Sequence, residues 1–134
     1  MGFLGGIFSK KADPLEALRE RVDANPKDAR LAQDLANQYA SGKFYGRAVH
    51  YARLAAQAHR EAGFAQKALG VLRSAQAWGP PSPELLQDLA EVLLQLKHKE
   101  DARGTLLKLR ELRAGDRAEL TRIDAQISEL GPRR

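Results

Sequence analysis

The side chains that most often carry out chemistry are few and scattered in this 134-residue chain. The candidates for acid–base work are His50, His59, His98 and the adjacent carboxylates Glu100 and Asp101. They fit no His-Glu-x-x-His metal pattern, and the chain has neither a glycine-rich phosphate loop nor a serine in a nucleophile elbow. Glu100 and Asp101 stand at a polar helix start, where carboxylates stabilise the positive end of the helix dipole. With no cysteine, thiolate ligands and nucleophiles are excluded. The sequence predicts no catalytic residue, no metal site, no cofactor and therefore no enzyme.

The chemistry that remains is that of binding, and it is concentrated between residues 39 and 78. Residues 35–83 hold six basic side chains against one acidic side chain, Glu61, and the same stretch contains six of the eight aromatic residues. Aromatic and arginine side chains are the usual anchors of protein interfaces. This pattern favours a protein or peptide partner, and the positive charge would suit one of acidic character.

Some of these aromatic residues are expected to serve the core instead. We expect Tyr39, Phe44 and Phe64 to be buried by packing between helices. Tyr45 and Trp78 stand near predicted helix ends, so we expect both to be partly exposed.

The elements that must position these side chains are all helical. Ala, Leu, Arg, Glu and Gln dominate, and these are strong helix formers. Periodicity and helix breakers predict helices over about residues 14–24, 28–40, 44–61, 64–78, 83–96, 100–113 and 116–130. Asp13 is a predicted N-cap with Pro14 at the first helical position, and Ser82 with Pro83 repeats that arrangement. The connections are short, so we expect one packed stack of about seven helices.

Internal repetition distinguishes this stack from a plain helical bundle. Residues 83–116 carry large and small apolar side chains at spaced positions, namely Leu86, Leu89, Ala90 and Leu93, then Ala102, Leu106 and Leu109. Thirty-four residues before Ala102 stands Ala68, followed by Leu72, Ala75 and Pro80. A third partial match is Leu35, Ala36, Tyr39 and Ala48. This pattern resembles the tetratricopeptide repeat.

The resemblance departs from the family pattern in two ways. The aromatic side chain expected early in each first helix is replaced by Ala32, Ala52 or Leu86, and the small position carries alanine where the family has glycine. The unit starting at Ala29 and the unit ending at Pro80 also both claim the helix over residues 44–61. The phase of the repeats is left open there.

The resemblance implies a short right-handed α-solenoid of antiparallel helix pairs over residues 13–131. Such arrays present the first helix of each pair along a concave groove that holds a partner. The groove positions it implies here are Gln33, Asn37, His50, Arg53, Gln57, Gln87 and Glu91. Together with the exposed aromatic residues, the predicted partner-binding set is Asn37, Tyr45, His50, Arg53, Gln57 and Trp78.

The N-terminal peptide, residues 1–12, is a separate feature. Phe3, Leu4, Ile7 and Phe8 have helical i, i+3 and i, i+4 spacing, and Lys10 and Lys11 follow. Three readings stay open: a weak interfacial anchor on a membrane surface, a linear motif that docks in another protein's groove, or a flexible end. No stretch approaches the roughly 18 apolar residues of a membrane-spanning helix.

The sequence therefore predicts a non-enzymatic adaptor or scaffold that binds a protein or peptide through a tetratricopeptide-like groove. The alternative is a membrane-peripheral or assembly-scaffold subunit attached through residues 1–11. The composition fits a cytoplasmic, bacterial protein. The charge outside the tails is too small and too spread to favour nucleic acid. Partner identity, repeat number and self-association are left open.

Overall fold

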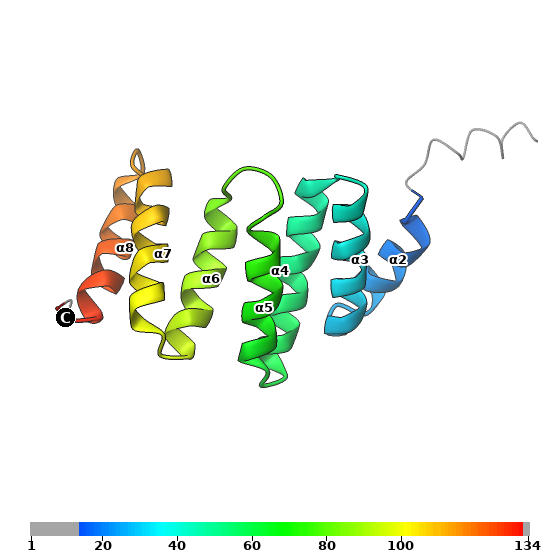
Figure 1. The fold of residues 1–134 in the computed structure, drawn as a ribbon, viewed down its shortest axis with the longest axis horizontal. Helices are drawn as coiled ribbons and strands as arrows, with labels where there is room; N and C mark the ends of the chain where they lie inside the picture. Colours follow the sequence, from blue (N-terminus) through cyan, green and yellow to red (C-terminus); the bar gives the residue numbers. More distant parts are fainter. Residues whose placement is uncertain (1–13, 133–134) are drawn as a thin grey trace, which may run out of the picture.

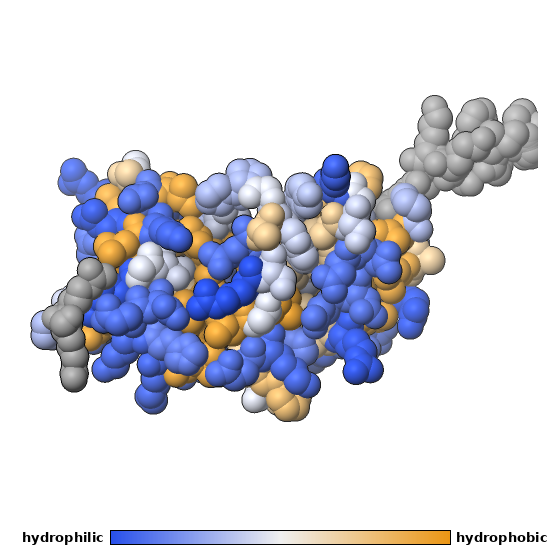
Figure 2. Space-filling view, viewed as in Figure 1, coloured by the Kyte–Doolittle hydropathy of each residue, from blue (hydrophilic) through white to orange (hydrophobic). Residues whose placement is uncertain are grey.

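Seven α-helices and no strand make up the part of the chain that this computed structural model describes, residues 14–132. They lie side by side in chain order (Figure 1), with polar side chains over most of the face shown in Figure 2 and apolar side chains between them. The all-α fold of packed helix pairs is confirmed. The predicted N-terminal peptide and the Asp13 cap lie outside the described residues. The helices are α2 (Glu16–Ala24), α3 (Ala29–Ser41), α4 (Tyr45–Glu61), α5 (Ala65–Ala75), α6 (Pro83–Gln95), α7 (Lys99–Leu112) and α8 (Arg117–Glu129).

Three helices begin at side-chain caps that the sequence already marks. Asp28 accepts a hydrogen bond from the Leu31 amide at 3.0 Å. Ser82 does the same for the Leu85 amide at 3.2 Å, with Pro83 as the first helical residue. Asp116 accepts from the Glu119 amide at 3.1 Å. Each bond satisfies an amide that has no partner within its helix, so these starts fall within a residue of the predicted positions.

Two predicted boundaries are wrong by two or three residues. The first helix starts at Glu16 because Pro14 and Leu15 form a turn. The helix predicted to reach Trp78 ends at Ala75. After Ala75 the chain tightens, since the amides of Ala77 and Trp78 bond to carbonyls only three residues back, and Gly79 then takes a φ of 77°.

The helices form two rows. Helix α4 packs on α6 as well as on its chain neighbours α3 and α5. A hydrogen bond from Tyr51 to Asp23, 3.3 Å long, joins α4 to α2, and one from Arg122 to Gln87, 2.8 Å long, joins α8 to α6. Helices α2, α4, α6 and α8 therefore share one row, and α3, α5 and α7 share the other. The repeat match that began at Ala29 therefore starts on a helix of the second row, and the match that ends at Pro80 starts on a helix of the first row.

Close packing around α4 depends on its alanines. Ala48, Ala52, Ala55 and Ala56 are all at most 2% exposed, and small side chains allow neighbouring helix axes to approach closely. Tyr39 is fully buried against this face, stacked on Tyr51 with ring centroids 5.8 Å apart. A second cluster joins α6, α7 and α8 through Leu86, Ala90, Leu106, Leu109 and Ile123.

The prediction that Phe44 and Phe64 are buried is wrong. They are 49% and 51% exposed. Each is the residue just before a helix and directly follows a left-handed residue, Lys43 with φ 66° or Gly63 with φ 88°. This turn leaves the ring at an end of the array, where Arg47 lies 5.8 Å from the Phe44 ring centroid and Lys67 lies 4.7 Å from that of Phe64.

Within residues 14–132, none of the helices combines the length and the apolar composition that crossing a bilayer requires.

Candidate functional site

One face of α4 carries a continuous line of polar side chains. His50, Arg53, Gln57 and Arg60 follow one another at intervals of three or four residues, so they share a helix face. The buried residues Ala48, Ala52 and Ala55 occupy the opposite side, and this division holds the polar face away from the core. His50 and Gln57 are exposed, whereas Arg53 and Arg60 are half-buried.

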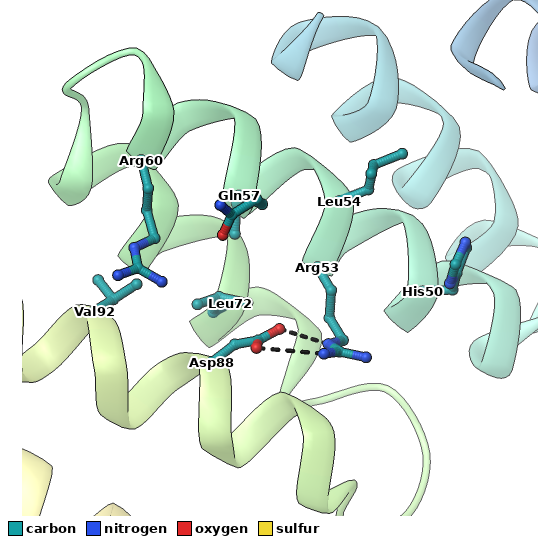
Figure 3. A pocket seen from close by; sticks show the side chains of 9 residues that line it. His50, Arg53, Leu54, Gln57, Arg60, Leu72, Asp88 and Val92 are labelled. Atoms are coloured by element: carbon teal, nitrogen blue, oxygen red, sulfur yellow. Dashed lines mark hydrogen bonds and ion pairs between the residues drawn. The ribbon is translucent and has the colours of Figure 1, made fainter. Parts of the chain in front are cut away.

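Helix α6 faces this line with carboxylate and amide groups. The Arg53 guanidinium donates to both carboxylate oxygens of Asp88, from Nε at 2.5 Å and from Nη2 at 3.4 Å (Figure 3). Seven residues along α4, Arg60 donates to Glu91 at 3.3 Å and to Gln95 at 3.0 Å. Two arginines of one helix therefore bridge to the next helix of the same row.

Between these two helices lies a trough. Its first part is a pocket of about 260 Å³ whose apolar lining includes Leu54, Leu72 and Val92, with Arg53 and Asp88 at its side (Figure 3). Its second part, about 450 Å³, is lined by polar side chains of α4 and α6. The two parts share Gln57 and Arg60. We call the combined surface the α4–α6 trough; its lining residues are His50, Arg53, Leu54, Ala56, Gln57, Arg60, Glu61, Leu72, Asp88, Glu91, Val92 and Gln95.

The charges of the trough are largely matched within the fold. The hydrogen bond to Asp88 is the main reason that the pKa of Arg53 is raised above its ordinary value. Glu91 receives a hydrogen bond from Gln87 at 2.8 Å as well as the one from Arg60. An acidic partner would therefore have to compete with Asp88 and Glu91, and the acidic character of the partner stays a prediction.

The structure brings only part of the predicted binding set together. His50, Arg53 and Gln57 all line the trough. Asn37 is exposed on α3 and is not among the lining residues. Tyr45 and Trp78 are half-buried, as expected, and line a different pocket of about 340 Å³ beside the α5–α6 connection. The predicted set is thus divided between two sites, and its binding role stays a prediction.

Sequence reasoning missed Arg60, Asp88 and Gln95 as trough residues. A signal for them exists in the spacing. Arg53 and Asp88 are 35 residues apart, and so are Arg60 and Gln95. One repeat is about 34 residues long. Two side chains that can pair and that stand one repeat apart in the sequence therefore indicate neighbouring helices of the same row.

Across residues 14–132, no three side chains among His, Asp and Glu converge on a point that could hold a metal ion. The predicted N-terminal attachment residues lie outside the described residues, so their role also stays a prediction.

A tetratricopeptide repeat family model matches residues 59–127. Among solved structures, the chain is similar to YrrB, described as a TPR protein with an unusual peptide-binding site, at 20% sequence identity and a TM-score of 0.49. That match covers 85% of this chain and 64% of YrrB, so the chain spans less than two thirds of the YrrB structure. No curated protein matches.

Proposed function

Because the chain belongs to the tetratricopeptide repeat family, whose members are generally non-catalytic protein-interaction modules, we propose that it is an adaptor that holds a protein segment in the α4–α6 trough. The observation that carries the proposal is the trough itself. It is an elongated depression between two helices of one row, with an apolar floor and hydrogen-bonding groups on both sides.

The chemistry of the trough suits an extended segment of polypeptide. Gln57 and Gln95 offer both amide donors and carbonyl acceptors, which match the alternating N–H and C=O groups of a peptide backbone. Half-buried Leu54 offers an apolar contact in the trough, and Leu72 and Val92 of the same lining are fully buried. Arg60, at the junction of the two pockets, is placed to contact any segment that runs the length of the trough.

A matched pair of variants tests this assignment. Arg60→Ala removes a trough arginine that pairs with Glu91 at 3.3 Å, and Arg73→Ala removes a second-row arginine that pairs with Asp101 at 3.4 Å. Both ion pairs join neighbouring helices of one row and are partly exposed, so both losses of stability should be small. The loss should be somewhat larger for Arg60→Ala, because Arg60 also donates to Gln95 at 3.0 Å. Only Arg60 lines the trough.

The full chain and both variants would be used to capture partners from a cell extract, with quantitative mass spectrometry as the readout. Truncation of an interface arginine commonly costs more than 1 kcal/mol, so Arg60→Ala should weaken capture at least about fivefold, while Arg73→Ala should leave it unchanged. Equal capture by all three proteins, with equal helical content by circular dichroism, contradicts the trough as the binding surface.

A further inference from the structure

The connection between α5 and α6, residues 76–82, is the longest between helices in the described part of the chain. It contains Trp78, Gly79, Pro80 and Pro81. The prolines fix the backbone, and the connection packs on the start of α4, because a Cβ at Gly79 would lie 3.4 Å from Cβ of Tyr45. This connection is therefore a rigid structure that carries the only tryptophan of the chain.

Two largely apolar pockets lie on either side of it. One, of about 340 Å³, is lined by Tyr45, Val49 and Trp78. The other, of about 410 Å³, includes Leu85, Leu86 and Leu112 in its lining. Both share Pro80, Pro81 and Ser82, so the two pockets are separated only by the width of the connection. We call this surface the Trp78 site.

The Trp78 site is distinct from the α4–α6 trough, since none of its lining residues lines the trough. Leu112 is 44% exposed, and Tyr45 and Trp78 are half-buried. Each pocket also has one carboxylate in its lining, Glu84 in the first and Glu111 in the second, and the second pocket contains Lys108 as well. Glu84 accepts hydrogen bonds from Ser82 at 3.3 Å and from Arg113 at 3.2 Å, so its charge is matched within the fold. A suitable occupant therefore has two large apolar anchors.

The sequence that precedes α2 contains such a segment. Successive helices run in opposite directions, so the start of α2, the α3–α4 turn and the α5–α6 connection lie at the same edge of the array (Figure 1). The sequence before α2 offers Phe3 and Leu4, then Ile7 and Phe8, followed by Lys10 and Lys11. Two apolar pairs separated by two residues match two largely apolar pockets.

The length of the segment is sufficient. The six residues from Phe8 to Pro14 can span about 20 Å when extended, and the eleven from Phe3 can span about 36 Å. The start of α6 lies two helices along the row from α2, a distance of about 20 Å at the usual spacing of packed helices. Ile7 and Phe8 could therefore reach the nearer pocket, and Phe3 and Leu4 the farther one.

We propose that the Trp78 site binds residues 3–11 of this same chain. The contact is independent of the proposed function, because it uses no residue of the trough. It gives the chain an internal latch: the N-terminal segment is held on the array until a competing partner releases it.

Fluorescence of Trp78 tests the latch in the full chain, because no other tryptophan contributes. In the variant Phe3→Ser/Phe8→Ser, Trp78 emission should shift to longer wavelength and acrylamide quenching should increase. The control Phe64→Ser, which alters an exposed phenylalanine at the opposite edge, should leave both unchanged.

A synthetic peptide with the sequence of residues 1–13 should reverse the shift when added to the double variant. A peptide with serine at positions 3 and 8 should bind at least about tenfold more weakly, since a buried phenylalanine side chain contributes about 1.5–3 kcal/mol. Leu112→Asp, made in the double variant, should weaken binding of the first peptide.

The proposal is overturned if the double variant and the unaltered chain have the same Trp78 emission and quenching. It is equally overturned if the double variant ignores the peptide but responds to vesicles of anionic phospholipid, which would make the site a membrane contact. If dilution of the unaltered chain moves its Trp78 emission to longer wavelength, the segment binds a second copy of the chain. That result contradicts the latch.

Discussion

The ion pair between Arg53 and Asp88 should contribute about 1 kcal/mol to the stability of the array. A hydrogen bond to a charged group contributes roughly 1.5–3 kcal/mol when well shielded, whereas fully exposed ion pairs contribute about 0.2–1 kcal/mol. The Arg53 side chain is 37% exposed and that of Asp88 is 24% exposed, so solvent screens the pair in part. Because one guanidinium makes both bonds, we expect the contribution of this ion pair to lie near the top of the range for exposed ion pairs.

A double-mutant cycle measures this value. Urea unfolding of the unaltered chain, Arg53→Ala, Asp88→Ala and the double variant gives four free energies of unfolding, whose combination isolates the coupling between the two side chains. We expect about 1 kcal/mol at low salt and a smaller value in 1 M NaCl, where the screening length falls to about 3 Å.

The pair between Arg110 and Asp124 is a suitable comparison. Its atoms are 2.7 Å apart, but both side chains are about half exposed, at 49% and 50%. Its coupling should be smaller than that of Arg53 and Asp88. A coupling for Arg53 and Asp88 that is zero within about 0.3 kcal/mol, or no larger than that of the exposed pair, would refute the argument that partial burial strengthens the link across the trough.

Three further predictions concern stability. Lys43→Gly should raise the free energy of unfolding by about 0.5–1 kcal/mol. A left-handed φ of 66° costs a residue with a side chain roughly 1–2 kcal/mol, and the greater chain entropy of glycine in the unfolded state offsets part of that gain. Lys43→Ala keeps the strain, so it should show no gain in a thermal melt. Burial, with a smaller effect from Lys67, lowers the pKa of His59. The unfolded chain therefore binds more protons than the folded chain, and the free energy of unfolding should decline as pH falls from 7.5 to 5.5. Urea unfolding of His59→Gln should show a weaker decline, and an unchanged pH dependence would contradict this. Ala52→Leu should cost about 1–3 kcal/mol, because Ala52 is fully buried where α4 meets its neighbours; an unchanged urea midpoint would show that the contact is looser than described.

Local sequence signals were sufficient for the helices. Ser82 and Asp116 have short polar side chains that cap helices through contacts three residues away, so the information lies within a single turn of the chain. The fourth helix was predicted too long because Trp78 continues its apolar pattern, whereas the backbone tightens after Ala75. Periodicity alone does not detect that change.

The trough could be predicted only in part, because it depends on which helices share a row. The resemblance to the tetratricopeptide repeat predicted His50, Arg53 and Gln57 as groove positions. Their partners on α6 become visible only once it is known that α4 and α6 share a row. For Phe44 and Phe64 the sequence predicted burial that the structure does not have. An aromatic residue beside a helix start looks like a core residue unless the left-handed residue before it is recognised.

The links between helices of one row have a consequence for the response to salt. Arg53 to Asp88, Arg60 to Gln95 and Gln87 to Arg122 each connect side chains one repeat apart. Because these bonds are ionic or polar and partly exposed to water, salt and water compete with them more than with the alanine-rich core behind them. We therefore expect rising ionic strength to weaken the contacts along a row before it weakens the packing between the two rows.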